Sequence, residues 1–139
     1  MQTFATTAPI TAVLAVPAGS IQFTAAERDT TTVEVRPANA AKGRDVKLAE
    51  QVTAEYSDGV LQVTSPEGNR IFGSSGAVEV TVHLPAGSRV EATAASARFT
   101  TEGPLGEVTF ESSQGTITVG EAATARLTTV DGDITARSL

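Results

Sequence analysis

Apolar anchors recur every nine residues in the last third of this chain, and this spacing constrains the fold more than any other feature. The anchors are Val90, Phe99, Val108 and Ile117, and a slightly looser spacing continues to Leu127 and Ile134. The strand signature Gly-x-Val/Ile-x-apolar begins at Gly106, Gly115 and Gly132. A short β unit cannot bury its apolar face alone, so recurring units are expected to stack and share one core.

Two of these spacings make one turn of the expected stack. Phe99 to Ile117 spans 18 residues, and Ile117 to Ile134 spans 17. The chain is therefore expected to be all-β, a stacked parallel β-solenoid or β-helix-like fold with two short strands in each 17–18-residue rung. Glycines at the corners are expected to relieve steric clash where the backbone turns sharply.

Residues 1–88 are expected to form an N-terminal β portion of the same single domain, ahead of the regular repeats of residues 89–139. Apolar and polar residues alternate along 78–84, as in a half-buried strand. Asp58-Gly59 lies between two strand-like runs and predicts a hairpin.

One segment departs from the β pattern. Val46, Ala49 and Val52 are spaced as on one face of a helix, which predicts one short helix near 45–52.

The tetrapeptide Pro-Ala-Gly-Ser occurs twice, at 17–20 and 85–88, and both copies are expected to be turns. The duplication suggests that both halves of the chain enter the stack in the same way.

Composition narrows the function. A net charge of −6 argues against nucleic-acid and anionic-lipid partners, which require clustered Lys and Arg. Aromatic residues make up 4% of the chain and Trp is absent, whereas an enzyme pocket or a recognition surface usually carries more aromatic side chains. The absence of Cys excludes thiol catalysis, Cys-ligated zinc and disulfides.

The N-terminal sequence has no basic start, and residues 10–16 are too short and broken an apolar run for a signal core or a membrane span. We therefore expect no membrane insertion and a cytoplasmic location.

No residue is assigned a catalytic, metal-binding or cofactor-binding role, and no cofactor is expected. His83 is expected on a polar strand face without partners for acid–base or metal chemistry. Glu107 and Glu111 share a strand face, but a glycosidase would also need a cleft and aromatic platforms.

Other functional motifs are equally incomplete. Asp131-Gly132-Asp133 lacks the tandem repeat of calcium-binding β-rolls and reads as a turn, and residues 73–76 read as a loop. An ice-binding Thr ladder fails in a 17-residue register, because Thr109 then meets Arg126.

Six short motifs spread over nearly the whole chain form a specific set: Met1-Gln2-Thr3-Phe4, Val33-Glu34-Val35-Arg36-Pro37, Ala49-Glu50-Gln51, Val63-Thr64-Ser65-Pro66, Leu84-Pro85-Ala86-Gly87-Ser88 and Gly132-Asp133-Ile134. As a set they resemble the bacterial putative-adhesin proteins with β-strand repeats, a domain-of-unknown-function family common in actinobacteria. The resemblance implies a β-solenoid fold and brings no catalytic residues with it.

The sequence thus favours a non-enzymatic scaffold or binding module. Self-association is expected through strand edges or the last rung, where Arg137-Ser138-Leu139 shows no capping element. The alternative is an adhesin-like module that binds carbohydrate or a surface. An enzyme is the third and weakest option.

Overall fold

The computed structural model describes residues 2–6, 8–27, 29–37, 39, 41, 43–64 and 77–138. Within these residues the chain forms one helix and nine strands, in this order: β1 (Gln2–Ala5), β2 (Thr11–Ala26), β3 (Thr30–Pro37), α1 (Gly43–Gln51), β4 (Thr53–Ser57), β5 (Val60–Thr64), β6 (Val78–Pro85), β7 (Arg89–Gln114), β8 (Ile117–Asp131) and β9 (Ile134–Ser138). The all-β class and the single short helix are confirmed.

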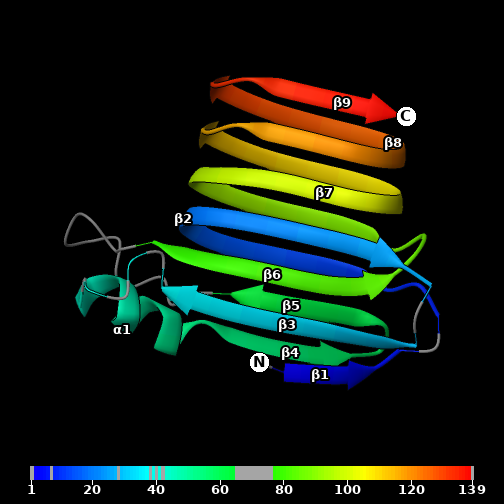
Figure 1. The fold of residues 1–139 in the computed structure, drawn as a ribbon, viewed down its shortest axis with the longest axis horizontal. Coiled ribbons are helices and arrows are strands. Elements are labelled where there is room, and N and C mark those ends of the chain that lie inside the picture. Colours follow the sequence, from blue (N-terminus) through cyan, green and yellow to red (C-terminus); the bar gives the residue numbers. More distant parts are fainter. Residues whose placement is uncertain are drawn as a thin grey trace.

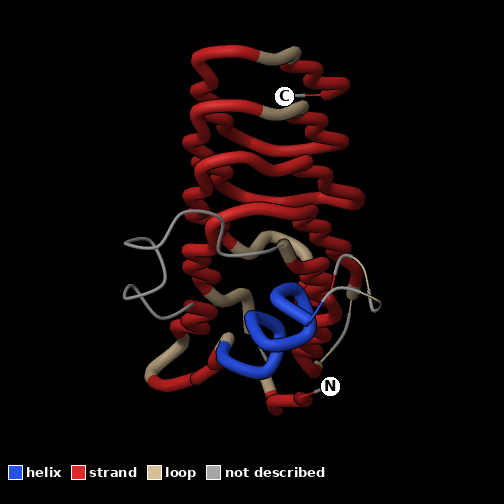
Figure 2. Tube along the Cα trace, turned by 90° about the vertical axis from the view of Figure 1, so that its left-hand side faces the viewer, coloured by secondary structure: helices blue, strands red, loops and turns tan. Residues whose placement is uncertain are grey.

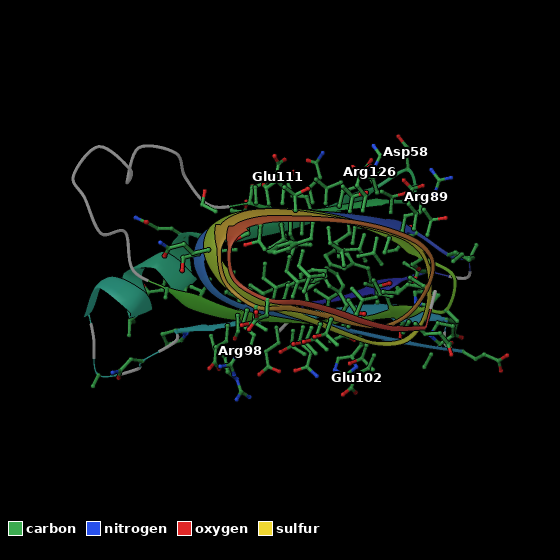
Figure 3. The ribbon with its side chains drawn as sticks, turned by 90° about the horizontal axis from the view of Figure 1, so that it is seen from above. Asp58, Arg89, Arg98, Glu102, Glu111 and Arg126 are labelled. Carbon is green, nitrogen blue, oxygen red and sulfur yellow. The ribbon has the colours of Figure 1, made fainter. Side chains whose placement is uncertain are left out.

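All nine strands belong to one sheet, which winds round a central core. Seen from above, the sheet is a flattened, barrel-like ring that nearly closes around inward side chains (Figure 3). Seen from the side, β7, β8 and β9 rise one above another from β2 (Figure 1). The ring has two broad faces joined by tight corners, because the long strands β2 and β7 bend from one face to the other.

The second half of the sheet is parallel and in register with the sequence spacing. Phe99 of β7 lies beside Ile117 of β8, and Ile117 lies beside Ile134 of β9. Below them, β2 pairs in parallel with β7 over residues 11–24 and 89–102. Each circuit of the ring supplies the long crossover that parallel neighbours require.

The first half of the sheet departs from the expected parallel solenoid. β1 with β3, β3 with β6, and β4 with β5 are antiparallel pairs, so the sheet is mixed. For β4 and β5 the physical reason is connection length: the turn at Asp58-Gly59 is too short for a crossover and can only reverse the chain. The hairpin predicted from this dipeptide is confirmed.

A column of aromatic rings runs through the core. Phe99 stacks on Phe110 with ring centroids 4.3 Å apart and meets Phe23 at 5.8 Å. All three are fully buried, among Val, Ile, Leu and Ala side chains that fill the narrow space between the two faces.

Several elements pack at the N-terminal end of the ring. Phe4 of β1 and Tyr56 of β4 bring their rings to 5.7 Å beneath the core. α1 lies outside the ring and contacts β3 and, less extensively, β6 (Figure 2). Among the described residues, no helix has the length and apolar character needed to cross a membrane.

The two Pro-Ala-Gly-Ser copies occupy different positions, so the prediction that both halves enter alike is wrong. Residues 17–20 lie inside the continuous strand β2, where Gly19 pairs with Ala97. Residues 85–88 form the turn between β6 and β7. There the Ser88 hydroxyl donates to the Pro85 carbonyl at 2.7 Å and accepts from the Ile10 amide at 3.0 Å. The neighbouring strands, rather than the tetrapeptide, decide the conformation.

Candidate functional site

The strand alternation divides the outer surface into two polar faces. Arg98 and Glu102 point away from the core on one face, whereas Arg89, Glu111 and Arg126 point away on the other (Figure 3). We call the first the groove face and the second the opposite face. Both are built by the same rule, since every second residue of a strand points outward.

An uncharged polar column runs along the middle of the groove face, parallel to the axis of the ring. The pairing of five strands places Thr81, Gln22, Thr100, Thr118 and Thr135 in consecutive neighbouring positions. Adjacent strands lie about 4.8 Å apart, so the column presents a hydroxyl or amide group at each such step. We call these five residues the central column.

Two open cavities lie along this column and meet at Thr100. The first, of about 330 Å³, spans β6, β2 and β7, and its polar lining is Ser20, Gln22, Glu79, Thr81, Arg98 and Thr100. The second, of about 310 Å³, spans β7 and β8 and is lined by Thr100, Thr101, Glu102, Gly103, Thr118, Gly120 and Glu121. Because Thr100 lines both cavities, we call the two cavities together the groove, which extends over four neighbouring strands.

Two glycines shape the second cavity. Gly103 and Gly120 place no side chains there, and a Cβ on Gly120 would come within 2.8 Å of the Thr101 carbonyl oxygen. The Gly120 amide donates to the buried Thr101 hydroxyl at 3.1 Å, which holds the two strands together at the base of the groove.

Charge is distributed unevenly along the groove. Glu79, Ser20 and Arg98 occupy neighbouring positions at one side of the central column, so the first cavity contains both signs. Glu102 and Glu121 line the second cavity, which has no Lys, Arg or His among its lining residues. The groove is therefore rich in hydrogen-bonding groups, with an acidic end.

The opposite face pairs some of its charges. Arg89 approaches Glu107 at 4.0 Å, with both side chains well exposed. Exposed pairs of this kind contribute little to stability.

The structure places the residues considered for catalysis on two different strands, β6 and β7. His83 is half-buried on β6, and its neighbours in register are Thr24 and Thr32. Glu107 and Glu111 are four residues apart on one strand, a separation of about 13 Å, which exceeds the carboxyl spacing of a glycosidase.

The turn at Asp131-Gly132-Asp133 lies between β8 and β9. No group of three or more His, Cys, Asp or Glu residues in the described part of the chain could hold a metal ion. Asp133 flanks the corner at Gly132, and residues 73–76 lie outside the described residues. Thr109 meets Arg126 and Thr118 meets Thr135, as the 17-residue register predicts.

The groove itself was missed from the sequence. Alternation marks Gln22, Thr81 and Thr100 as outward residues on separate strands, but nothing local indicates that these strands are neighbours. Gln22 and Thr100 are 78 residues apart in sequence, and only the tertiary pairing brings them side by side.

Comparison with known proteins identifies the fold. No protein-family model matches the chain, and neither does any curated protein. A putative cell adhesion protein from Clostridium sporogenes ATCC 15579 superposes with a TM-score of 0.54 and 10% identity, over 99% of this chain and 98% of that chain. A putative adhesin from Bacteroides fragilis NCTC 9343 aligns with a TM-score of 0.36 and 9% identity, over 97% and 95% of the two chains. The first similarity shows a shared fold, whereas the TM-score of the second is too low to show one.

Proposed function

We propose that this chain is a non-catalytic, adhesin-like binding module that attaches to a polyhydroxylated polymer, such as a surface glycan, through the groove face. The observation that carries the proposal is the pair of neighbouring cavities that share Thr100, whose lining combines hydroxyl, amide and carboxylate groups. These groups donate to and accept from sugar hydroxyls. The putative cell adhesion protein with the same fold is consistent with this role.

The absence of catalysis is part of the same proposal. It is supported by the wide separation of Glu107 from Glu111 along β7 and by the register neighbours of His83, Thr24 and Thr32, neither of which is a carboxylate that could orient the imidazole. We further propose that β2, β7, β8 and β9 form a β-solenoid, supported by their parallel pairing at offsets that match one circuit of the ring.

The test is glycan retention by variants that remove groove hydroxyls without changing side-chain shape. Thr100→Val with Thr118→Val is expected to weaken retention on an immobilised surface polysaccharide by about tenfold, the loss expected from two hydrogen bonds. Thr109→Val, on the opposite face, is the matched control and should bind normally. Retention of no polysaccharide, or equal binding by the double variant, would contradict the proposal.

Self-association is a second candidate, favoured by the edge strand β9. Ile134 on β9 is a large hydrophobic residue that is nevertheless 46% exposed. β9 pairs only with β8 among the described strands, so its outer edge offers free backbone groups to another copy.

Sedimentation velocity across a concentration series tests this second candidate. Association should increase with concentration and be abolished by Ile134→Lys, because the new charge would have to be buried in the contact. Thr93→Lys, an exposed change on β7, should associate like the parent. A monomer at every concentration would exclude this candidate.

The proposed function and the cytoplasmic location that the N-terminal sequence predicts cannot both hold. A module that binds a surface glycan requires an extracellular route. Fractionation of cells that express the native protein decides between the two, since a purely cytosolic protein could not serve as an adhesin.

A further inference from the structure

Each end of the ring has strand edges that are unpaired among the described strands. At the C-terminal end these are β9 and residues 122–131 of β8, which β9 does not cover. At the N-terminal end they are β1, which pairs only with β3, and β4, which pairs only with β5. Such edges offer free backbone groups to another strand.

The strand directions allow the sheet of one copy to continue into the next. β1 is antiparallel to β3, and β3 is antiparallel to β6, so β1 runs in the direction of β6. From β6 through β2, β7 and β8 to β9, every neighbouring pair is parallel. β9 of one copy would therefore run parallel to β1 of a copy stacked on it, as the next parallel strand of the sheet.

On the opposite face, the two ends carry opposite charges at the same position round the ring. Arg126 lies on the unpaired segment of β8, whereas Glu55 lies on β4 and Asp58 in the turn that follows it. All three residues are exposed. Seen along the ring axis, Asp58 and Arg126 lie at the same part of the circumference, although they belong to opposite ends (Figure 3).

Strand register places Glu55 and Arg126 in one column. From the N-terminal end to the C-terminal end, the column consists of Glu55, Gln62, Val13, Glu91, Thr109 and Arg126. Glu91 and Thr109 lie on successive circuits of β7, at the same 18-residue offset that brings Arg89 to Glu107. A copy stacked along the ring axis would continue this column with its own Glu55.

The groove face has the reverse arrangement of charge. Arg36 lies on β3 beyond the segment that β1 covers, and its side chain is 69% exposed beside Glu34. Asp133 is exposed at the corner before β9. The register of the intervening strands forms a column of Arg36, Glu79, Ser20, Arg98, Thr116 and Asp133.

We propose that copies of this chain associate head to tail, with the C-terminal end of one ring against the N-terminal end of the next. This arrangement rests on the self-association proposed for β9 and specifies the partner surface and the direction of assembly. Arg126 then approaches Glu55 and Asp58 of the next copy. On the groove face Asp133 approaches Arg36, so both faces match in charge.

The same charges oppose a dimer of two C-terminal ends. Joined with their corresponding faces aligned, two such ends would bring Arg126 of one copy against Arg126 of the other, which is unfavourable. A head-to-tail contact instead leaves one free end on each side of every pair. It therefore produces an open series of oligomers rather than a closed dimer.

The test exchanges charges between the two ends and follows oligomer size by sedimentation velocity. Arg126→Glu alone and Glu55→Arg alone should each weaken association at least about tenfold, because each places like charges across the contact. The double variant, with the two charges exchanged, should recover association. An equimolar mixture of the two single variants should also associate, since each end of one variant matches the other end of the second.

Two controls make the same charge changes away from the ends. Arg89→Glu and Glu91→Arg lie on β7, between β2 and β8, and should associate like the parent. Raising the salt concentration should weaken association of the parent, because exposed charges are screened.

The outcomes separate the head-to-tail contact from self-association in general. A parent whose size stops at the dimer overturns the head-to-tail contact and leaves self-association through β9 standing. So does a failure of both the double variant and the mixture to recover association. A monomer at every concentration overturns both.

Discussion

The corners of the ring make the strictest demands on single residues. Gly115 has φ of +132°, and a Cβ there would lie 1.8 Å from the Ala97 carbonyl oxygen on the turn below. Gly132, on the turn above, would meet the Gly115 carbonyl at the same distance. Glycine is needed both for the backbone conformation and for the close approach of successive turns. The sequence predicted this corner role from the Gly-x-Val/Ile-x-apolar signature alone.

Gly115→Ala is therefore expected to lower the free energy of unfolding by about 3 kcal/mol, since it combines an unfavourable φ with a backbone clash. Urea denaturation followed by circular dichroism measures the change. Gly43→Ala is the control, because a Cβ on this first residue of α1 meets nothing within 4 Å. A loss below about 1 kcal/mol for Gly115→Ala would show that the corner relaxes, contrary to this account.

At the scale of elements, the spacing of apolar residues predicted which strand residues are neighbours only where one circuit of the ring separates them. Phe99 beside Ile117 and Ile117 beside Ile134 follow directly from the 17- and 18-residue intervals. The Pro-Ala-Gly-Ser copies show the limit of local patterns, since one is a bend inside β2 and the other is a turn fastened by Ser88. Identical residues adopt different structures because different strands pair with them.

Ile117 and Ile134 occupy equivalent positions on two successive circuits of the ring, so they offer a matched comparison. Ile117 is fully buried between Phe99 and Ile134, whereas Ile134 is 46% exposed. Ile117→Ala should lower the free energy of unfolding by about 3 kcal/mol, through lost burial and an unfilled cavity. Ile134→Ala should cost about 1 kcal/mol or less, because less apolar area leaves water when this side chain folds. Equal losses in denaturant titrations would mean that the outer turn packs as tightly as the inner one.

At the scale of the whole molecule, the groove could not be predicted, because it depends on pairings between distant segments. Residues 11–24 pair with 89–102, across the helix, the hairpin and β6. No periodicity links these segments, and the mixed orientation of the first half arises from turns that reverse the chain. Thr and scattered charged residues could be predicted on the surface from the sequence. Which strands lie side by side could not.

The same architecture predicts a gradient of local stability along the ring axis. β7 lies between β2 and β8, whereas β9 pairs only with β8 among the described strands and carries the exposed Ile134. Because the stacked turns stabilise one another mainly through contacts with their neighbours, opening should begin at β9 and reach β7 last.

Hydrogen exchange resolved by mass spectrometry can measure this gradient. Amides of β9 should exchange at least about 100-fold faster than those of β2 and of the β7 segment paired with it, because local opening requires less free energy than global unfolding. Ile134→Ala should speed exchange in β9 and leave β2 unchanged, which separates local opening from a general loss of stability. Uniform protection from β2 to β9 would instead mean that the ring unfolds as one cooperative unit, in spite of its stacked turns.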